Sequence, residues 1–352
     1  MIVLGIESSC DETAAAVVED GSRVRSSVVA DQYALHSEYG GVVPEIASRA
    51  HERHILPVIR SALGDAGVTL EDLDAIAVGH RPGLVGSLLV GISAAKALSW
   101  SLGVPLIGVD HVHAHLDAAT LDDEPLAFPA LGLVVSGGHT TLYAMRSETE
   151  LTRLGGTIDD AAGEAFDKVA SILGLGHPGG PVLDALASES DADDQAFQFP
   201  IGLIKKDNLN FSFSGVKTSV LYEVRGRPKP PTIPGKPPLV VPPVPEMTDA
   251  RKRDIAASFQ RAVCAALLRK TEAAWTRHAP FRTLVMGGGV TANSRLRREM
   301  TELGDRLGVP VRMPPKKYCV DNGAMIAGLG SKMLAKGLWD DLTLTAVPTT
   351  AC

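Results

Sequence analysis

Two copies of one short pattern, a strand followed by a polar turn and a returning strand, constrain the fold of this chain more than any other feature. In the first copy, apolar residues at 2–6 lead into a polar turn at 7–13, and residues 14–18 return. The second copy follows the same plan over residues 131–146. Two such hairpins far apart in the chain favour a duplicated architecture, although two unrelated hairpins fit the pattern equally well.

Segments with strand and helix patterns alternate along the rest of the chain. Strands are predicted at 73–80, 104–110 and 281–289. Helices are predicted at 51–67, 85–103, 163–175, 251–278, 292–308 and 321–337. This order is typical of the α/β class with partly parallel sheets.

Length and charge narrow the class of protein further. The 352 residues suffice for two domains, each with its own core. The net charge of −7 argues against a protein that coats nucleic acid without specificity. The four cysteines form no CxxC pair and the N-terminus carries no basic leader, so a reducing, cytoplasmic setting is predicted.

Two stretches of unusual composition need an interpretation. Residues 84–109 are apolar enough to span a bilayer, but Lys96 lies in the middle and Gly103 and Pro105 interrupt the run. A buried helix followed by a strand is therefore predicted instead of a membrane span. Residues 225–248 hold nine of the 23 prolines, which predicts an extended surface loop. A tolerated insertion is favoured there over a docking motif.

The segment DHVHAHLDAA, residues 110–119, places three histidines at alternate positions. In a helix, His111 and His115 share one face, one turn apart, whereas His113 points elsewhere. Such a pair can reach one metal ion, although the spacing is more often incidental, and the Glu of the HExxH protease motif is missing. Asp321 either completes a site of two histidines and one carboxylate or caps the helix that follows it.

Glycine-rich segments at 136–140, 178–180 and 287–290 can expose backbone N–H groups to a ligand. The last of them has a strand before it and a helix after it, which suits a nucleotide or anion at a helix N-terminus. Asn293 either caps that helix or hydrogen-bonds a ribose or base. Asp167 lies near the second glycine segment in sequence, and a carboxylate beside glycines suits the hydroxyl groups of a ribose.

Taken together, ten motifs resemble the universal tRNA threonylcarbamoyladenosine transferase family, whose bacterial form is TsaD. They are, in chain order, GIESSCDET, GGVVPEIASRAH, PGLVGSLLVG, HVHAH, VVSGGHT, IDDAAGEAFDKVA, PGGP, NFSFSGVKT, GGGVTAN and DNGAMIA. The resemblance runs from residue 1 to about 340. It implies an actin-like (ASKHA) α/β fold of two related domains, with the active site in the cleft between them. The domains are expected at 1–130, joined by a C-terminal segment at about 322–345, and at 131–321 with the proline-rich loop inserted.

The resemblance also implies a reaction and its partners. The threonylcarbamoyl group of threonylcarbamoyl-AMP is transferred to N6 of A37, the adenosine 3′ of the anticodon, in tRNAs that read ANN codons. The product is threonylcarbamoyladenosine, t6A, and AMP is released. The expected partners are tRNA, a TsaB-type paralogue and a TsaE-type ATPase, in the cytoplasm and without a membrane.

Site residues follow from the resemblance position by position. One divalent metal ion, with Fe²⁺ favoured and Zn²⁺ as the second choice, is assigned to His111, His115 and Asp321. Substrate is assigned to Ser9, Val134, Val135, Ser136, Gly137, Gly138, Asp167, Gly180, Asp184 and Asn293. Adenine is expected near residues 287–293 and the ribose near Asp167 and Asp184. A base role is assigned to Asp11 or Glu12.

The chain departs from the family pattern in two places. The family usually has Gly-Pro-Gly where this chain has Arg81-Pro82-Gly83, so Arg81 either contacts a phosphate or faces solvent. The proline-rich loop is also longer than usual. Candidate tRNA-phosphate contacts are the basic residues Arg251, Lys252, Arg253, Arg295, Arg297, Arg298, Lys316 and Lys317.

Three other functions fit parts of the sequence pattern. A sugar or acetate kinase of the actin-like superfamily would share the hairpins and glycine turns but needs no histidine pair. A metalloprotease lacks support because the HExxH glutamate is missing. A catalytically silent scaffold would resemble the family's shorter paralogue, which lacks the histidine pair that this chain has.

Overall fold

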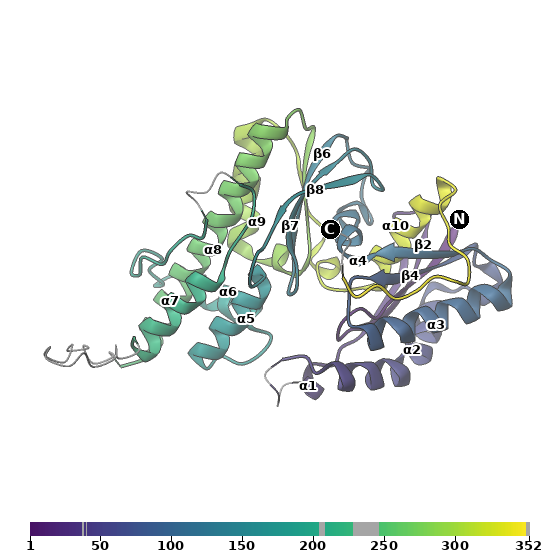
Figure 1. The fold of residues 1–352 in the computed structure, drawn as a ribbon, viewed down its shortest axis with the longest axis horizontal. Helices are drawn as coiled ribbons and strands as arrows, with labels where there is room; N and C mark the ends of the chain where they lie inside the picture. The colour runs from purple at the N-terminus through teal and green to yellow at the C-terminus, as the bar shows by residue number, and fades with distance from the viewer. Residues whose placement is uncertain (37–38, 40, 204–207, 228–245, 350–352) are drawn as a thin grey trace, which may run out of the picture.

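Two five-stranded sheets with the same strand order form the framework of the molecule (Figure 1). The computed structural model describes residues 1–352 apart from 37–38, 40, 204–207, 228–245 and 350–352. The first sheet has the order β3-β2-β1-β4-β5, and the second has β8-β7-β6-β9-β10. In each sheet the first three strands are antiparallel and the last two are added in parallel. The repeated order confirms the predicted duplication.

The predicted hairpins form the strands β1 and β2 of the first sheet and β6 and β7 of the second. A third strand, β3 or β8, extends each hairpin at the edge of its sheet. The first sheet comprises β1 (Ile2–Glu7), β2 (Thr13–Glu19), β3 (Arg23–Ala30), β4 (Ala75–Arg81) and β5 (Leu106–Asp110). The second sheet comprises β6 (Ala130–Val135), β7 (Thr140–Met145), β8 (Leu151–Gly156), β9 (Thr283–Gly287) and β10 (Val311–Arg312). The third strands β3 and β8 were not predicted, because edge strands with mixed polar residues carry a weak pattern.

The helices largely follow the sequence pattern. Those before the second sheet are α1 (Tyr33–His36), α2 (Pro44–Ala66), α3 (Val85–Leu102) and α4 (His111–Asp117). Those within or after it are α5 (Ala162–Leu173), α6 (Gly179–Ala187), α7 (Ser214–Arg225), α8 (Asp249–His278), α9 (Ser294–Leu307) and α10 (Gly323–Ala335). Short 3-10 turns are η2 (Leu70–Asp72), η3 (Ala118–Thr120), η4 (Gly289–Ala292) and η5 (Lys316–Tyr318).

Helices cover the first sheet on both faces, which explains why its central strands are apolar throughout. Leu4 and Ile6 pack into a cluster with α2 and α3, whereas Val3 faces the opposite cluster, to which α10 contributes. This alternation is the two-residue period of a strand. The helix α10 follows the second sheet in the chain, yet it packs against β1, β2 and β4 of the first sheet (Figure 1).

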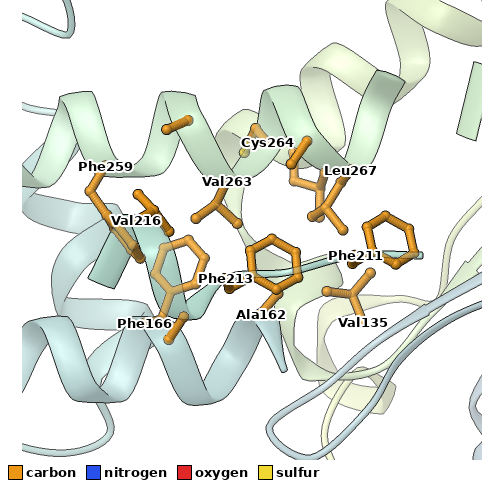
Figure 2. Close-up of a cluster of buried hydrophobic side chains, with 14 of the residues drawn as sticks. Val135, Ala162, Phe166, Phe211, Phe213, Val216, Phe259, Val263, Cys264 and Leu267 are labelled. Carbon is orange, nitrogen blue, oxygen red and sulfur yellow. The ribbon is translucent and has the colours of Figure 1, made fainter. Parts of the chain in front are cut away.

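The second sheet has its larger core on the side of α5, α7, α8 and α9. Phe166, Phe211, Phe213 and Phe259 are among its largest fully buried side chains (Figure 2). On the other face, α4 inserts Val112 and Leu116 between the two halves and against the sheet. Because α4 leaves the first sheet and packs on the second, its residues lie where the two halves meet.

The apolar stretch at 84–109 forms helix α3 and strand β5, as predicted. Among the described residues, α3 is the single helix long and apolar enough to cross a membrane. Leu88, Ile92 and Ala95 pack it onto the first sheet, but its outer face leaves Trp100 exposed. The helix is therefore buried on one face instead of all round.

Several predictions need correction or stay open. The glycines at 178–180 were predicted to turn, but Gly179 begins helix α6. Of the loop predicted at 225–248, residues 228–245 lie outside the described residues, Arg225 ends α7 and Thr248 caps α8. The division into 1–130 with 322–345 and 131–321 remains a prediction, which the packing of α10 on the first sheet supports.

Candidate metal centre

The short helix α4 carries both histidines of the predicted metal group. Asp110 begins it, because its Oδ1 accepts the backbone N–H groups of Val112 and His113 at 3.0 and 3.2 Å. The imidazole rings of His111 and His115 then lie on one face, with centroids 4.6 Å apart. His113 turns away and packs edge-on against the ring of Tyr143. The helical spacing therefore brings His111 and His115 together and turns His113 away, as the sequence predicts.

Asp321 joins the two histidines from the segment before α10. Its Oδ1 lies 3.3 Å from Nε2 of His115 and 3.6 Å from Nε2 of His111. It does not cap α10, since the side chain of Asn322 accepts the N–H of Met325 instead. One donor atom from each of the three residues lies within 4.8 Å of the others.

The donor set fits a transition-metal ion. A tetrahedral ion about 2.1 Å from each ligand separates the ligands by about 3.4 Å, close to the two Nε2–Oδ1 distances. Within the described part of the chain, neither ring nitrogen of the fully buried His115 makes a hydrogen bond. A buried nitrogen without a hydrogen bond is costly, and a cation coordinated at Nε2, on the side of Asp321, would satisfy that nitrogen. Imidazole with carboxylate suits iron or zinc.

The charges around the metal group favour the protonated form of His111. Burial lowers the pKa of His111, but the carboxylates of Asp321 and Glu7 outweigh it and raise the pKa to about 10. Burial raises the pKa of Asp321, yet the adjacent His111 and His115 bring it well below its usual range. Burial keeps the pKa of His115 below its usual range, so this ring is neutral at pH 7.

Glu7 belongs to this group although its place in the sequence did not single it out. It is the last residue of β1 and is fully buried. Its Oε2 lies 3.0 Å from Nδ1 of His111, and its Oε1 accepts the N–H of Ser9 at 2.5 Å. Within the polar stretch Glu7–Thr13, it resembled one more solvated turn residue. The signal that could have found it is a carboxylate placed at the end of an otherwise apolar, buried strand.

The turn after β1 brings the predicted acids to the same region. Burial, followed by the charges of Asp321 and Asp11, holds the pKa of Glu12 well above its usual range. The hydroxyl of Tyr33 donates to Glu12 Oε1 at 3.2 Å. Asp11 is also buried. Ser9 lies against the metal group directly, with Oγ 3.2 Å from Nδ1 of His111.

The matching turn of the second sheet is neutral and built from backbone. Val134 and Val135 are fully buried in apolar clusters on opposite faces of β6, so only their backbone can face a ligand. Gly137 and Gly138 are open: a Cβ at either would meet nothing within 4 Å. The backbone N–H of Ser136 donates to the carbonyl of His139, which closes the turn.

The remaining predicted substrate residues form a connected set across α5, α6 and α9. Asp167 accepts the N–H of Gly179 at 2.8 Å. Asp184 accepts both the N–H and the hydroxyl of Ser294, at 3.0 and 2.7 Å. The side chain of Asn293 caps α9 through the N–H of Leu296 and donates to Gln260. The cap interpretation of Asn293 is thus confirmed.

The glycines divide into two groups by what surrounds them. Gly180 and Gly289 have open space where a side chain would lie, like the two glycines of the β6–β7 turn. Gly287 is different, because a Cβ there would overlap the backbone oxygen of His115, and Gly288 has φ of +94°. Gly287 lets β9 approach α4, and Gly288 lies against the backbone of Val135, whereas the open glycines have no such neighbour among the described residues.

Most of the basic residues predicted to meet tRNA are bound within the chain. Arg295 pairs with Asp194 and Glu299, Arg253 with Glu189 and Asp191, and Arg251 with Glu223. Arg297 donates to the carbonyl oxygens of Thr291 and Pro314. Arg81 does not simply face solvent, since its Nε lies 3.0 Å from Asp110 Oδ2, and a phosphate contact stays a prediction.

Fold and site together define an actin-like α/β protein with a candidate metal group where its two halves meet. Solved structures agree on the fold. The match to HypF from T. kodakarensis has a TM-score of 0.57 at 14% identity and covers 96% of this chain and 48% of that one. The match to component A of the (R)-2-hydroxyglutaryl-CoA dehydratase of Acidaminococcus fermentans has a TM-score of 0.54 at 16% identity, covering 95% and 99%.

Sequence comparison identifies the family. Residues 23–328 match the TsaD family, described as tRNA N6-adenosine threonylcarbamoyltransferase. The chain is 50% identical over 349 residues to the protein of that name from Trichlorobacter lovleyi, covering 99% of this chain and 96% of the relative. It is 49% identical over 364 residues to the one from Sorangium cellulosum, covering 100% and 97%. The chain belongs to the tRNA N6-adenosine threonylcarbamoyltransferase family and is a transferase of tRNA modification.

Proposed function

We propose that the protein transfers the threonylcarbamoyl group of threonylcarbamoyl-AMP to N6 of A37 in tRNAs that read ANN codons, with release of AMP. The observation that carries the proposal is the group of His111, His115 and Asp321 in a chain of this family, next to the open glycine turn, whose His139 ring lies 6.2 Å from the ring of His111. The donor is a mixed anhydride, so attack by an amine on its carbonyl carbon forms the new C–N bond and breaks the bond to the AMP oxygen.

The proposed division of labour follows from the geometry. A bound Fe²⁺, or Zn²⁺ as the second choice, would be held by His111, His115 and Asp321 and would polarise the carbamoyl carbonyl. Open space at Gly137, Gly138 and Gly180 leaves room for the adenylate. The carboxylates of Asp167 and Asp184 keep lone pairs for ribose hydroxyls beyond the hydrogen bonds they already accept.

Glu12 is the better candidate for the general base. The attacking N6 amine must lose a proton, and a base is most effective when its pKa lies near the working pH. Burial and the neighbouring carboxylates Asp321 and Asp11 raise the pKa of Glu12 well above its usual range, which is the direction that favours a base. Asp11 then acts on Glu12 through its charge.

The proposal also covers the setting of the reaction. The tRNA is bound together with a TsaB-type paralogue and a TsaE-type ATPase in the cytoplasm. The internal ion pairs of Arg251, Arg253 and Arg295 support this arrangement, because they leave those side chains less available for phosphates. A joint surface with the partners would supply the missing contacts.

A transfer assay tests the proposal. Protein, partners, threonylcarbamoyl-AMP and unmodified ANN-reading tRNA are combined, and the digested tRNA is searched for t6A by mass spectrometry. Product is expected from the wild type and absent from His111→Ala/His115→Ala. His113→Ala is the matched control, because this histidine lies on the same helix but faces Tyr143.

The outcomes separate the parts of the proposal. Product that survives in the double variant would refute a catalytic role for the metal while the reaction stands. A wild type that forms no t6A, while a relative of known activity does so in parallel, would refute the reaction and favour a scaffold. Circular dichroism checks that each variant is folded.

A further inference from the structure

Glu7 occupies a position that ordinary packing does not explain. A fully buried carboxylate is costly unless its oxygens are satisfied, and here both are used. Oε1 accepts the N–H of Ser9, and Oε2 faces Nδ1 of His111, the nitrogen on the far side of the ring from Asp321. The neighbouring strand makes room for it: a Cβ at Gly79 would lie 2.7 Å from Glu7 Oε2.

Two side chains compete for the same nitrogen of His111. Glu7 Oε2 lies 3.0 Å from Nδ1, and the hydroxyl of Ser9 lies 3.2 Å from it. A carboxylate can only accept, so it requires Nδ1 to carry the proton, whereas a hydroxyl can donate and leave Nδ1 bare. In a neutral ring the proton would then move to Nε2, the nitrogen that points toward Asp321.

We infer that Glu7 is a positioning residue that holds His111 in the tautomer protonated at Nδ1, so that the Nε2 lone pair faces the metal. This inference rests on the metal site of the proposed function. Glu7 also ties that histidine to the backbone of Ser9, and so to the turn that carries Asp11 and Glu12. One buried carboxylate therefore positions both the metal ligand His111 and the acidic turn. Such outer partners raise metal affinity by fixing ring orientation and tautomer.

Zinc binding tests the inference without reference to activity. The Kd for Zn²⁺ is measured by competition with a chromophoric chelator, because Zn²⁺ is diamagnetic and suits later spectroscopy. Glu7→Gln, which keeps size but removes the charge, is expected to weaken binding about 10- to 100-fold. Asp117→Asn is the matched control, since Asp117 is also buried and lies on α4 but pairs with Lys332. Its Zn²⁺ affinity should stay close to that of the wild type.

Two further variants separate positioning from loss of charge. Gly79→Ala leaves Glu7 in place but crowds its Oε2, so it should weaken Zn²⁺ binding in the same direction. Gly64→Ala is its control, because a Cβ there meets nothing within 4 Å. Adding Ser9→Ala to Glu7→Gln removes the competing hydroxyl and should restore part of the affinity.

The tautomer itself is read by NMR. In zinc-loaded protein labelled with ¹⁵N-histidine, His111 should show a protonated Nδ1 and a metal-bound Nε2. A protonated Nε2, or unchanged Zn²⁺ affinity in Glu7→Gln, would overturn the inference while the metal site stands. A wild type that binds no Zn²⁺ and no Fe²⁺ would instead refute the metal site and the positioning role together.

Discussion

The two halves of the molecule share a strand order but differ in the chemistry of their matching turns. The turn after β1 is lined by buried acids and hydroxyls, and the helix after β5 adds two histidines. The turn after β6 has no charged residue before His139 and offers open backbone at Gly137 and Gly138. One turn therefore carries charge and the other offers open space, and Asp321, from the segment after the second sheet, meets the histidines that follow the first sheet. One scaffold can thus supply a charged centre and a neutral cradle from equivalent positions.

Removing the residue that links the halves should have the largest effect. Asp321→Ala deletes the only carboxylate of the donor group, so metal content should fall to the background of metal analysis. We expect t6A formation to drop by more than the roughly 100-fold upper range for an outer-shell partner. Asn322 still caps α10, so the helix should persist by circular dichroism. A variant that retains a full equivalent of metal would contradict this assignment.

The acidic turn of the first half is tested by Glu12→Gln. We expect kcat to fall about 100-fold or more with metal content unchanged, because a general base is lost. In the wild type the rate should rise with pH as Glu12 loses its proton, and its raised pKa places that rise above the usual carboxyl range. The variant should lose this limb of the profile. Asp11→Asn should show a smaller decrease, and equal losses in both variants would sink the assignment.

Two glycines test the difference between a residue needed for packing and a residue that leaves space for the ligand. Gly287→Ala should destabilise the protein by about 1–3 kcal/mol, because its Cβ overlaps the backbone of His115. Gly138→Ala should leave the unfolding free energy nearly unchanged but raise KM for the adenylate, since its Cβ enters the proposed ligand space. Urea unfolding and steady-state kinetics measure the two effects. A Gly138→Ala variant that loses stability and keeps its KM would contradict the cradle.

Protonation of His111 should make the affinity for the metal ion depend on pH. Without metal, His111 carries a proton at pH 7 because its pKa is raised to about 10, while His115 is neutral. Metal displaces that one proton, so affinity should rise about tenfold per pH unit between pH 6 and 8. Calorimetry in buffers of different ionisation enthalpy should report about one proton released per ion. A pH-independent affinity would show that His111 is neutral beforehand.

The smallest effect is expected at Arg81, which pairs with Asp110 at the start of α4. Arg81→Gln removes the ion pair with Asp110, but the side chain of Arg81 is 37% exposed. Such a pair contributes about 0.2–1 kcal/mol, so the unfolding free energy should fall by less than about 1 kcal/mol. Asp110 keeps its two backbone contacts, and Zn²⁺ affinity should not change. A large loss of affinity would instead place Arg81 in the support of α4.

The sequence predicted the parts of this arrangement that depend on local pattern. Hairpin alternation located β1, β2, β6 and β7, and the i, i+4 spacing put His111 and His115 on one face. Local pattern could not decide whether Asp321 caps a helix or meets histidines 200 residues away, because the competing cap, Asn322, is its neighbour. The family resemblance supplied that choice.

The features that the sequence did not predict depend on burial in the folded protein, which the order of residues alone does not show. Glu7 resembled a turn residue because acids are rarely buried, and only the neighbouring strand shows that Gly79 gives it room. The ion pairs of Arg295 and Arg253 joined segments far apart in the chain, so these residues resembled a basic surface. The open and crowded glycines are identical in sequence and differ only in their surroundings.

The position of α10 has a consequence for how the protein is made. A nascent chain emerges from the ribosome N-terminus first. All strands of the first sheet lie within residues 1–110, yet the helix that covers one of its faces comes from residues 323–335. That apolar face stays open until residues 323–335 have been made, and Asp321 is made just before them. Capture of the metal ion by the complete donor group therefore requires a chain made at least to residue 321, and a chain truncated before Asp321 lacks both the helix that covers this face and the third ligand.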